Sequence, residues 1–316
     1  MVQTLGPSPE LTPPALVIIG GPTAVGKTEV SIELAERLGA EIISADSVQL
    51  FKGLDIGSAK PSPEQLARVP HHLVDVLEPW EKVDAARYAR MAEEVIAELA
   101  ARGKRAMVVG GSGLYIRALL FGLAQTPPVD PKLRQQLASQ WQAKGPRAMH
   151  QWLERLDAAT AARLHPNDRQ RVLRALEVCI QTGRPFSELH KGFNKPRYPY
   201  IMIVLFLPKD ELDERIAIRT REMFKAGIVE EVKALLDAGV APSAHALGSL
   251  GYRQAVQYIQ GRITLQEAIE ATIKETKAYA RRQLTWFRKE KQAQWFLATE
   301  REGVYKRIKQ FWEEAR

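Results

Sequence analysis

A glycine-bracketed octapeptide near the start of the chain has residue types that suit phosphate binding. The stretch Gly21-Pro22-Thr23-Ala24-Val25-Gly26-Lys27-Thr28 matches the pattern G-x-x-x-x-G-K-[ST]. Its glycines let the chain turn tightly, so that backbone N–H groups converge on an anion. The lysine reaches the outer phosphates and the threonine hydroxyl can hold Mg²⁺. We therefore expect residues 21–28 to bind a phosphorylated ligand, with Thr28 as the metal ligand.

The residues on either side of this loop predict the elements that position it. The apolar run 15–20 is typical of a buried parallel strand, and residues 29–38 place Val30, Leu34 and Leu38 on one helical face. A strand, a glycine-rich turn and a helix N-terminus together form an anion site, because the helix dipole adds positive potential.

Two further strand ends carry polar side chains. Asp46 follows the expected strand 41–45, and Ser112 lies in a Gly-Gly-Ser-Gly turn between the strand 106–109 and a helix from Leu114. Because ligands of α/β sheets bind beyond the carboxyl ends of the strands, we expect both side chains beside the phosphate site. A turn or helix-capping role is the alternative for Asp46.

The order of these elements predicts an α/β fold, a P-loop doubly wound parallel sheet with a helical insertion domain and a helical C-terminal region. Strands are expected at 71–76 and 200–206, and helices at 84–101, 212–236 and 304–312, the last amphipathic. The polar, glycine-containing segment 52–61 is expected to be a loop over the site. The adjacent histidines in the strand 71–76 would point to opposite faces, which makes them a poor metal pair.

Composition changes define the expected domains. Residues 1–14 contain several prolines and no targeting pattern, so we expect a disordered lead-in. Residues 15–124 and 196–316 would form the core, and the helical residues 125–195 an insertion. No apolar run approaches the roughly 20 residues that span a bilayer, so we expect a cytoplasmic protein without membrane contact. A monomer is the default expectation.

The chain of 316 residues carries a formal net charge of +8, which favours a polyanionic partner. Residues 274–316 hold twelve Lys or Arg against six Asp or Glu, and the stretch 274–289 interleaves basic residues with Trp286 and Phe287. Such a surface would grip phosphates and stack bases of a nucleic acid. An ordinary solvated face is the alternative. The single cysteine, Cys179, shares a helical pattern with Val172, Leu176 and Ile180 and is expected in a core.

From these residues alone, three classes of function stay open. A small-molecule kinase would transfer the outer phosphoryl group, and a nucleic-acid-stimulated NTPase would hydrolyse it. A transferase would use the loop to hold a departing diphosphate while a nucleic-acid atom attacks carbon.

The chain resembles the tRNA dimethylallyltransferase (isopentenyl-tRNA transferase) family. The motifs that carry the resemblance are residues 20–28, 46–49, 55–61, 110–115, 165–171, 251–254 and 282–288. The resemblance implies transfer of a dimethylallyl group from dimethylallyl diphosphate to the exocyclic N6 amine of the adenosine 3′-adjacent to the anticodon, with Mg²⁺. It also implies that this base is flipped out of its stack.

The same resemblance implies roles for individual residues. Asp46 would be the general base, Ser112 would contact the substrates, and Arg219 would clamp the diphosphate with Arg215 as second choice. The anticodon stem-loop of tRNA would be contacted by these residues: Asp46, Ser47, Val48, Gln49, Ser112, Arg134, Gln170, Arg171, Val172, Leu173, Arg174, Gly248, Ser249, Leu250, Gly251, Tyr252 and Arg253. Three positions depart from the family pattern: Phe51 replaces a frequent Tyr, Ser112 a usual Thr, and Lys277-Ala278-Tyr279 a usual Arg-Gln-Tyr.

Overall fold

The computed structural model describes residues 13–123, 126–189 and 195–315. The chain divides into two units, Met1–Leu120 with Arg197–Arg316 and Phe121–Pro196. These boundaries lie within a few residues of the expected junctions at 124/125 and 195/196. Of the expected lead-in, residues 1–12 lie outside the described residues.

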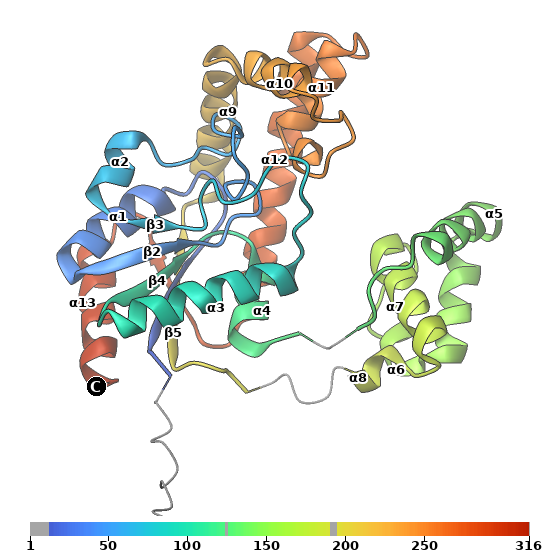
Figure 1. Cartoon of the computed structure of the whole chain (residues 1–316), viewed down its shortest axis with the longest axis horizontal. Coiled ribbons are helices and arrows are strands. Elements are labelled where there is room, and N and C mark those ends of the chain that lie inside the picture. The colour runs from blue at the N-terminus through green and yellow to red at the C-terminus, as the bar shows by residue number, and fades with distance from the viewer. Residues whose placement is uncertain (1–12, 124–125, 190–194, 316) are drawn as a thin grey trace, which may run out of the picture. The chain divides into compact units, whose positions relative to one another are not determined.

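A parallel sheet forms the centre of the larger unit (Figure 1), with strand order β3-β2-β4-β1-β5-β6. β1 is fully buried, and its Val17 pairs with Met107 of β4 on one side and with Ile201 of β5 on the other. Continuous apolar strands of this kind suit a parallel sheet that is covered on both faces. The strands of the sheet are β1 (Leu16–Gly20), β2 (Ala40–Ser44), β3 (His71–His72), β4 (Arg105–Val109), β5 (Tyr200–Phe206) and β6 (Ala293–Leu297).

Helices cover both faces of this sheet. Val304, Ile308 and Trp312 of the last helix pack with residues of the first helix and with Val17 and Ile19 of β1. Leu16 and Ile18 point to the opposite face, where they are equally buried. The helices of this unit are α1 (Lys27–Leu38), α2 (Pro63–Arg68), α3 (Ala85–Ala101), α4 (Gly113–Phe121), α9 (Lys209–Lys225), α10 (Ile228–Asp237), α11 (Tyr252–Ile259), α12 (Leu265–Phe287) and α13 (Arg301–Glu314), with a 3-10 turn at Ala246–Gly248.

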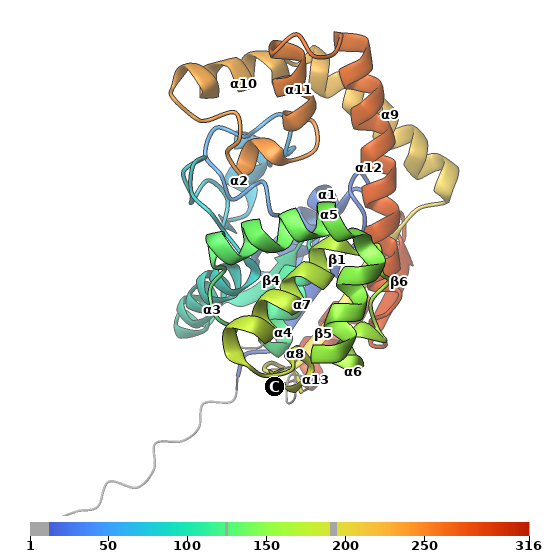
Figure 2. The same cartoon turned by 90° about the vertical axis from the view of Figure 1, so that its right-hand side faces the viewer.

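The strand order sets the place of the crevice. From β1 the chain crosses to β2, whereas from β4 it proceeds to the other side of the sheet, so β1 and β4 are neighbours whose connections diverge. Gly110, at the end of β4, donates its N–H to the carbonyl of Ile19. The phosphate-loop motif and the Gly110–Gly113 turn therefore begin side by side. Helices α9–α12 gather in one group in both views (Figures 1 and 2).

The smaller unit is helical, as expected. It contains α5 (Pro131–Leu156), α6 (Ala158–Ala161), α7 (Arg169–Thr182) and α8 (Phe186–Leu189). α5 is kinked at Gly145, whose φ of 78° leaves the helical region just before Pro146. Leu137, Met149 and Val172 belong to its core.

Several expectations need correction. The helix 212–236 is two helices, because Gly227 adopts φ 105° between α9 and α10. The strand 71–76 is reduced to His71–His72, and β6 was not predicted. Cys179 is buried as expected, but Ile180 is 40% exposed and lies outside the core. Phe287 is fully buried, so this side chain does not offer a base-stacking surface.

The packing of α13 predicts a measurable stability effect. Ile308 is fully buried, whereas Ile218 of α9 is 47% exposed. We expect Ile308→Ala to lower the free energy of unfolding by about 2–4 kcal/mol, since it removes buried methyl groups and leaves a cavity. The control Ile218→Ala should change it by less than about 0.5 kcal/mol. Chemical denaturation measures both, and equal effects would show that α13 does not seal the core.

Candidate active site

A cavity of about 660 Å³ lies beyond the carboxyl ends of the strands in the larger unit. It brings together residues far apart in sequence, including Lys27, Asp46, Arg219 and Gln283. Further lining comes from residues 57–60, from α9 and α12, and from the segment 248–253. The cavity thus joins the phosphate-loop motif to several of the side chains singled out from the sequence.

The motif at residues 21–28 has the backbone shape of a phosphate loop. Gly21 and Gly26 have φ values of 144° and 99°, which glycine adopts without strain. Ala24 also lies in the left-handed region, at φ 64°. No side chain caps the start of α1 at Gly26. The N-terminus of this helix therefore keeps its N–H groups for an anion.

Lys27 is folded back onto its own loop. Its Nζ donates to the carbonyl of Gly21 at 3.0 Å and to that of Pro22 at 2.7 Å. Burial lowers the pKa of Lys27 to about 8, although the Asp46 carboxylate favours the charged form, and the Arg219 charge lowers it further. The two carbonyl partners of Nζ are neutral, so a bound anion would neutralise the charge of this buried ammonium.

Asp46 stands at the end of β2 and faces this pair of cations. Its Oδ1 accepts from the N–H of Val48 at 2.8 Å and from that of Gln49 at 3.4 Å. The expected turn role is therefore present together with the position beside the phosphate site. No hydrogen bond to Oδ2 is found among the described residues, so this oxygen can accept a proton from a ligand.

The two arginines expected near phosphate differ in their surroundings. Arg219 lines the cavity, and burial lowers its pKa below the usual range while Asp46 opposes the shift. A nitrogen of Arg215 lies 4.0 Å from where a Cβ on Gly26 would sit, and Arg215 also pairs with Glu211 at 2.9 Å. Both positions are compatible with phosphate contact, and Arg219 is the one enclosed in the cavity.

Ser112 lies next to the strand that carries Asp46. Its N–H donates to the carbonyl of Ala45 at 3.2 Å, and it opens the first turn of α4. Unlike Asp46, Ser112 is not among the residues that line the cavity. Its expected substrate contact stays a prediction.

Gln49 orients one wall of the cavity. Its Oε1 accepts from the Ser44 hydroxyl at 3.0 Å, and its Nε2 donates to the carbonyls of Ser58 and Ala59. The segment 52–61 is thereby held against the cavity, as its composition predicted.

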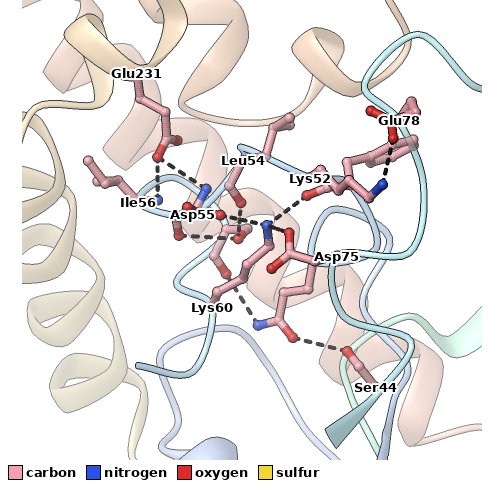
Figure 3. Close-up of polar contacts among 12 residues, drawn as sticks. Ser44, Lys52, Leu54, Asp55, Ile56, Lys60, Asp75, Glu78 and Glu231 are labelled. Atoms are coloured by element: carbon pink, nitrogen blue, oxygen red, sulfur yellow. Dashed lines mark hydrogen bonds and ion pairs between the residues drawn. The ribbon is translucent and has the colours of Figure 1, made fainter. Parts of the chain in front are cut away.

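Lys60 is the anchor of that segment (Figure 3). Its side chain is only 6% exposed, and its Nζ pairs with Asp55 at 2.6 Å, with Asp75, and with the carbonyl of Phe51 at 2.7 Å. Glu231 holds the same segment from α10 by accepting from the N–H groups of Asp55 and Ile56. The lysine is thus a structural cation, and no local sequence pattern predicts its burial.

Of the segment expected to contact tRNA in the larger unit, Gly248, Ser249, Leu250 and Arg253 line the cavity, as do Ser47 and Val48. The predicted tRNA contact of Tyr252 is wrong, because its side chain is fully buried. Its hydroxyl donates to Glu231 at 2.6 Å and accepts from the N–H of Gly57 at 3.1 Å. Gly251, with φ 86°, provides the turn into α11. Tyr252 therefore supports the cavity wall instead of touching a ligand.

Within the helical unit, the predicted tRNA contacts fall into two groups. Val172 and Leu173 are buried in its core, which rules out contact through these side chains. Gln170 and Arg171 are exposed. Arg134 and Arg174 both donate to the buried carboxylate of Glu177, at 2.9 and 2.6 Å. Arg134 is nevertheless 47% exposed, so part of its guanidinium stays available.

Sequence reasoning missed Gln283 and gave no ligand role to Tyr279 of α12, both of which line the cavity. Burial and the Asp46 charge raise the pKa of Tyr279 to about 12, so its hydroxyl stays protonated at neutral pH. No group of three or more His, Cys, Asp or Glu suited to a metal occurs in the described part of the chain. The Thr28 hydroxyl, at the start of α1, lines the cavity and can hold a metal together with oxygens of a bound ligand.

Comparisons with known proteins decide the family. The model of the IPP transferase family matches residues 49–290. The chain belongs to this family. It is 47% identical to the tRNA dimethylallyltransferase of Geobacter sulfurreducens, an alignment covering 89% of this chain and 91% of the relative. Identity with the tRNA dimethylallyltransferase of Myxococcus xanthus is 50%, covering 88% and 90%.

Solved structures of IPP transferases have the same fold. The full-length tRNA isopentenylpyrophosphate transferase of Bacillus halodurans matches with a TM-score of 0.72 and 36% identity, covering 95% of this chain and 97% of that structure. The tRNA delta(2)-isopentenylpyrophosphate transferase of Staphylococcus epidermidis matches with a TM-score of 0.70 and 32% identity. This match covers 96% of this chain and 100% of that structure. The P-loop α/β assignment is thus confirmed. Among the described residues, no helix is long and apolar enough to cross a membrane.

The Lys60 anchor predicts a local effect. Lys60→Met should leave Asp55 and Asp75 facing each other without a cation and lower the free energy of unfolding by about 1–2 kcal/mol, because both carboxylates are half-exposed and can hydrate. Amide exchange should accelerate in residues 55–61. The control Lys52→Met breaks an exposed pair with Glu78 and should change neither quantity. Equal exchange rates in both variants would refute the anchor.

Proposed function

We propose that this chain is a tRNA dimethylallyltransferase, which moves a dimethylallyl group from dimethylallyl diphosphate to the N6 amine of the adenosine 3′-adjacent to the anticodon. The observation that carries the proposal is the placement of one carboxylate, Asp46, in a cavity with the phosphate loop and two buried cations, Lys27 and Arg219. Membership of the IPP transferase family and the names of the relatives support it.

The Asp46 carboxylate can orient and deprotonate the amine that attacks the allylic carbon. An adenine amine is a poor nucleophile, because its lone pair is delocalised into the ring. The N–H bonds from Val48 and Gln49 fix the Asp46 carboxylate through Oδ1. Its Oδ2 then accepts a hydrogen bond from the amine, orients it toward the allylic carbon, and takes its proton as the C–N bond forms.

The opposite side of the cavity receives the leaving group. As the bond between the allylic carbon and oxygen breaks, both electrons leave with the diphosphate, whose charge grows. Loop N–H groups, Lys27 and Arg219 stabilise that charge, with Arg215 as a second arginine. Lys27 exchanges the carbonyls of Gly21 and Pro22 for phosphate oxygens. The residues fit a Mg²⁺ ion, which Thr28 would hold and which would neutralise part of the diphosphate charge when bound.

The acceptor is the anticodon stem-loop of tRNA. The target base must leave its stack to reach Asp46, and residues 46–49 with Gly248–Leu250 and Arg253 line its destination. Exposed residues of the helical unit, Gln170, Arg171 and Arg134, contact the anticodon arm, with Arg174 and its buried neighbours shaping that surface. The net charge of +8 favours this polyanion. The protein acts as a cytoplasmic monomer.

One transfer assay tests the proposal. Radiolabelled dimethylallyl diphosphate and Mg²⁺ are incubated with an unmodified tRNA transcript, and with a matched transcript that has guanosine in place of the adenosine 3′ of the anticodon. Label should enter only the adenosine transcript. A parallel incubation also contains ATP, and consumption of ATP with a phosphorylated small molecule and no labelled tRNA would show a kinase instead. ATP hydrolysis stimulated by tRNA would show an NTPase.

Asp46 gives the sharpest variant. Asp46→Asn keeps the shape of the side chain but cannot accept the amine proton, so we expect kcat to fall by about 10²–10⁴-fold. The Kd for tRNA, measured by filter binding, should stay within about threefold, because phosphate contacts from basic side chains supply most of the affinity for a nucleic acid. A loss of tRNA binding equal to the loss of activity would show that Asp46 is structural.

The depressed pKa of Lys27 gives a pH dependence. With a pKa of about 8 in the free protein, Lys27 is charged below that pH and neutral above it, so anion binding weakens as the pH rises. Calorimetry should show the affinity for dimethylallyl diphosphate falling by about tenfold between pH 7 and pH 9. Lys27→Arg stays charged and should show a flat profile, whereas Lys27→Ala should bind weakly throughout. A flat wild-type profile would contradict the assignment of Lys27.

A further inference from the structure

A single glutamine from the C-terminal half of the chain connects the two glycine-rich loops of the site. Gln283 lies on α12 and is 6% exposed. Its Oε1 accepts from the N–H of Thr23 in the phosphate loop at 2.9 Å. Its Nε2 donates to the carbonyl of Gly111 in the turn after β4 at 3.0 Å. One amide thus satisfies one backbone group in each loop.

The contact with Thr23 acts on the peptide unit that holds Lys27. The N–H of Thr23 and the carbonyl of Pro22 belong to the same planar peptide and point in opposite directions. Gln283 takes the N–H end, and the Nζ of Lys27 donates to the carbonyl end at 2.7 Å. Rotation of this peptide would break both hydrogen bonds together. Gln283 therefore fixes the orientation of the Pro22 carbonyl, which accepts a hydrogen bond from Lys27.

The packing of α12 makes this connection rigid. A Cβ on Gly111 would lie 2.0 Å from Gln283 Nε2, and one on Gly113 would lie 2.2 Å from Trp286 Cδ2. A Cβ on Gly20 would lie 2.3 Å from Phe287 Cε1. The last turns of the helix therefore rest directly on backbone at three glycines, which leaves the loops little freedom to move apart.

We propose that Gln283 is a positioning residue, which holds the phosphate loop and the Gly110–Gly113 turn at a fixed separation and aligns the Pro22–Thr23 peptide for Lys27. Both polar atoms of its side chain bond to backbone groups of the two loops, so it acts on the site through these loops. This role rests on the proposed function, in which the loop binds the diphosphate of the prenyl donor.

The first test compares Gln283→Met with the control Trp312→Phe. The methionine keeps the volume of the side chain but loses both hydrogen bonds. The control loses a different, partly buried hydrogen bond, from Trp312 Nε1 to the carbonyl of Ala15 at 3.1 Å, away from the loops. Without tRNA, Gln283→Met should bind dimethylallyl diphosphate about tenfold more weakly and show faster amide exchange at Thr23, whereas the control should do neither. Unchanged affinity and exchange would overturn the role. Failure of the wild type to bind the ligand would instead overturn the proposed function.

A double-mutant cycle keeps the test informative if Gln283→Met folds poorly. Gly111→Ala would place its methyl group against Nε2 and displace the amide, so it should also weaken binding by about tenfold. Gln283→Ala removes the clash. The double variant Gly111→Ala/Gln283→Ala should therefore bind no more weakly than Gln283→Ala alone. Additive losses would show that the two residues act independently and would contradict the proposal.

Discussion

The charge balance around Asp46 is the interaction on which the rest of the site depends. One carboxylate faces the buried cations Lys27 and Arg219, whose positive charge exceeds what it can neutralise. A cavity with this excess is incomplete without an anion, which explains why Lys27 turns back to carbonyl oxygens. The sheet positions these charges, because β1 and β2 end at the same edge, next to the phosphate loop and Asp46.

Helices from the C-terminal half of the chain enclose the phosphate loop and Asp46, which come from the N-terminal half. Arg219 comes from α9, and Gln283 comes from α12. Tyr252 joins α10 to the loop after β2 through its bonds with Glu231 and Gly57. The phosphate loop would be an ordinary anion site without these elements, and with them it lies in a cavity large enough for a diphosphate and a base.

The sequence predicted the parts of this site that follow from local patterns. The loop at 21–28, the strand at 200–206 and the amphipathic helix at 304–312 each have a local signature, and Asp46 follows from its place after a strand. The missed features depend on tertiary contacts. The edge strand β6 depends on pairing with β5, and Tyr252 and Phe287 are buried against residues distant in sequence. Lys60 is buried because a folded loop brings Asp55, Asp75 and the carbonyl of Phe51 around its Nζ. From residue type alone, a polar or aromatic side chain that contacts a ligand cannot be told from one that is buried and supports the fold.

If the phosphate loop holds a diphosphate that departs from carbon, each reaction yields a free diphosphate and a modified base, and both products can be counted. Released inorganic diphosphate is measured by a coupled pyrophosphatase assay, and nucleosides of the same tRNA sample are analysed by mass spectrometry. We expect one diphosphate for each adenosine that has gained a C₅H₈ group. Release of orthophosphate without any modified base, in the absence of added pyrophosphatase, would contradict it.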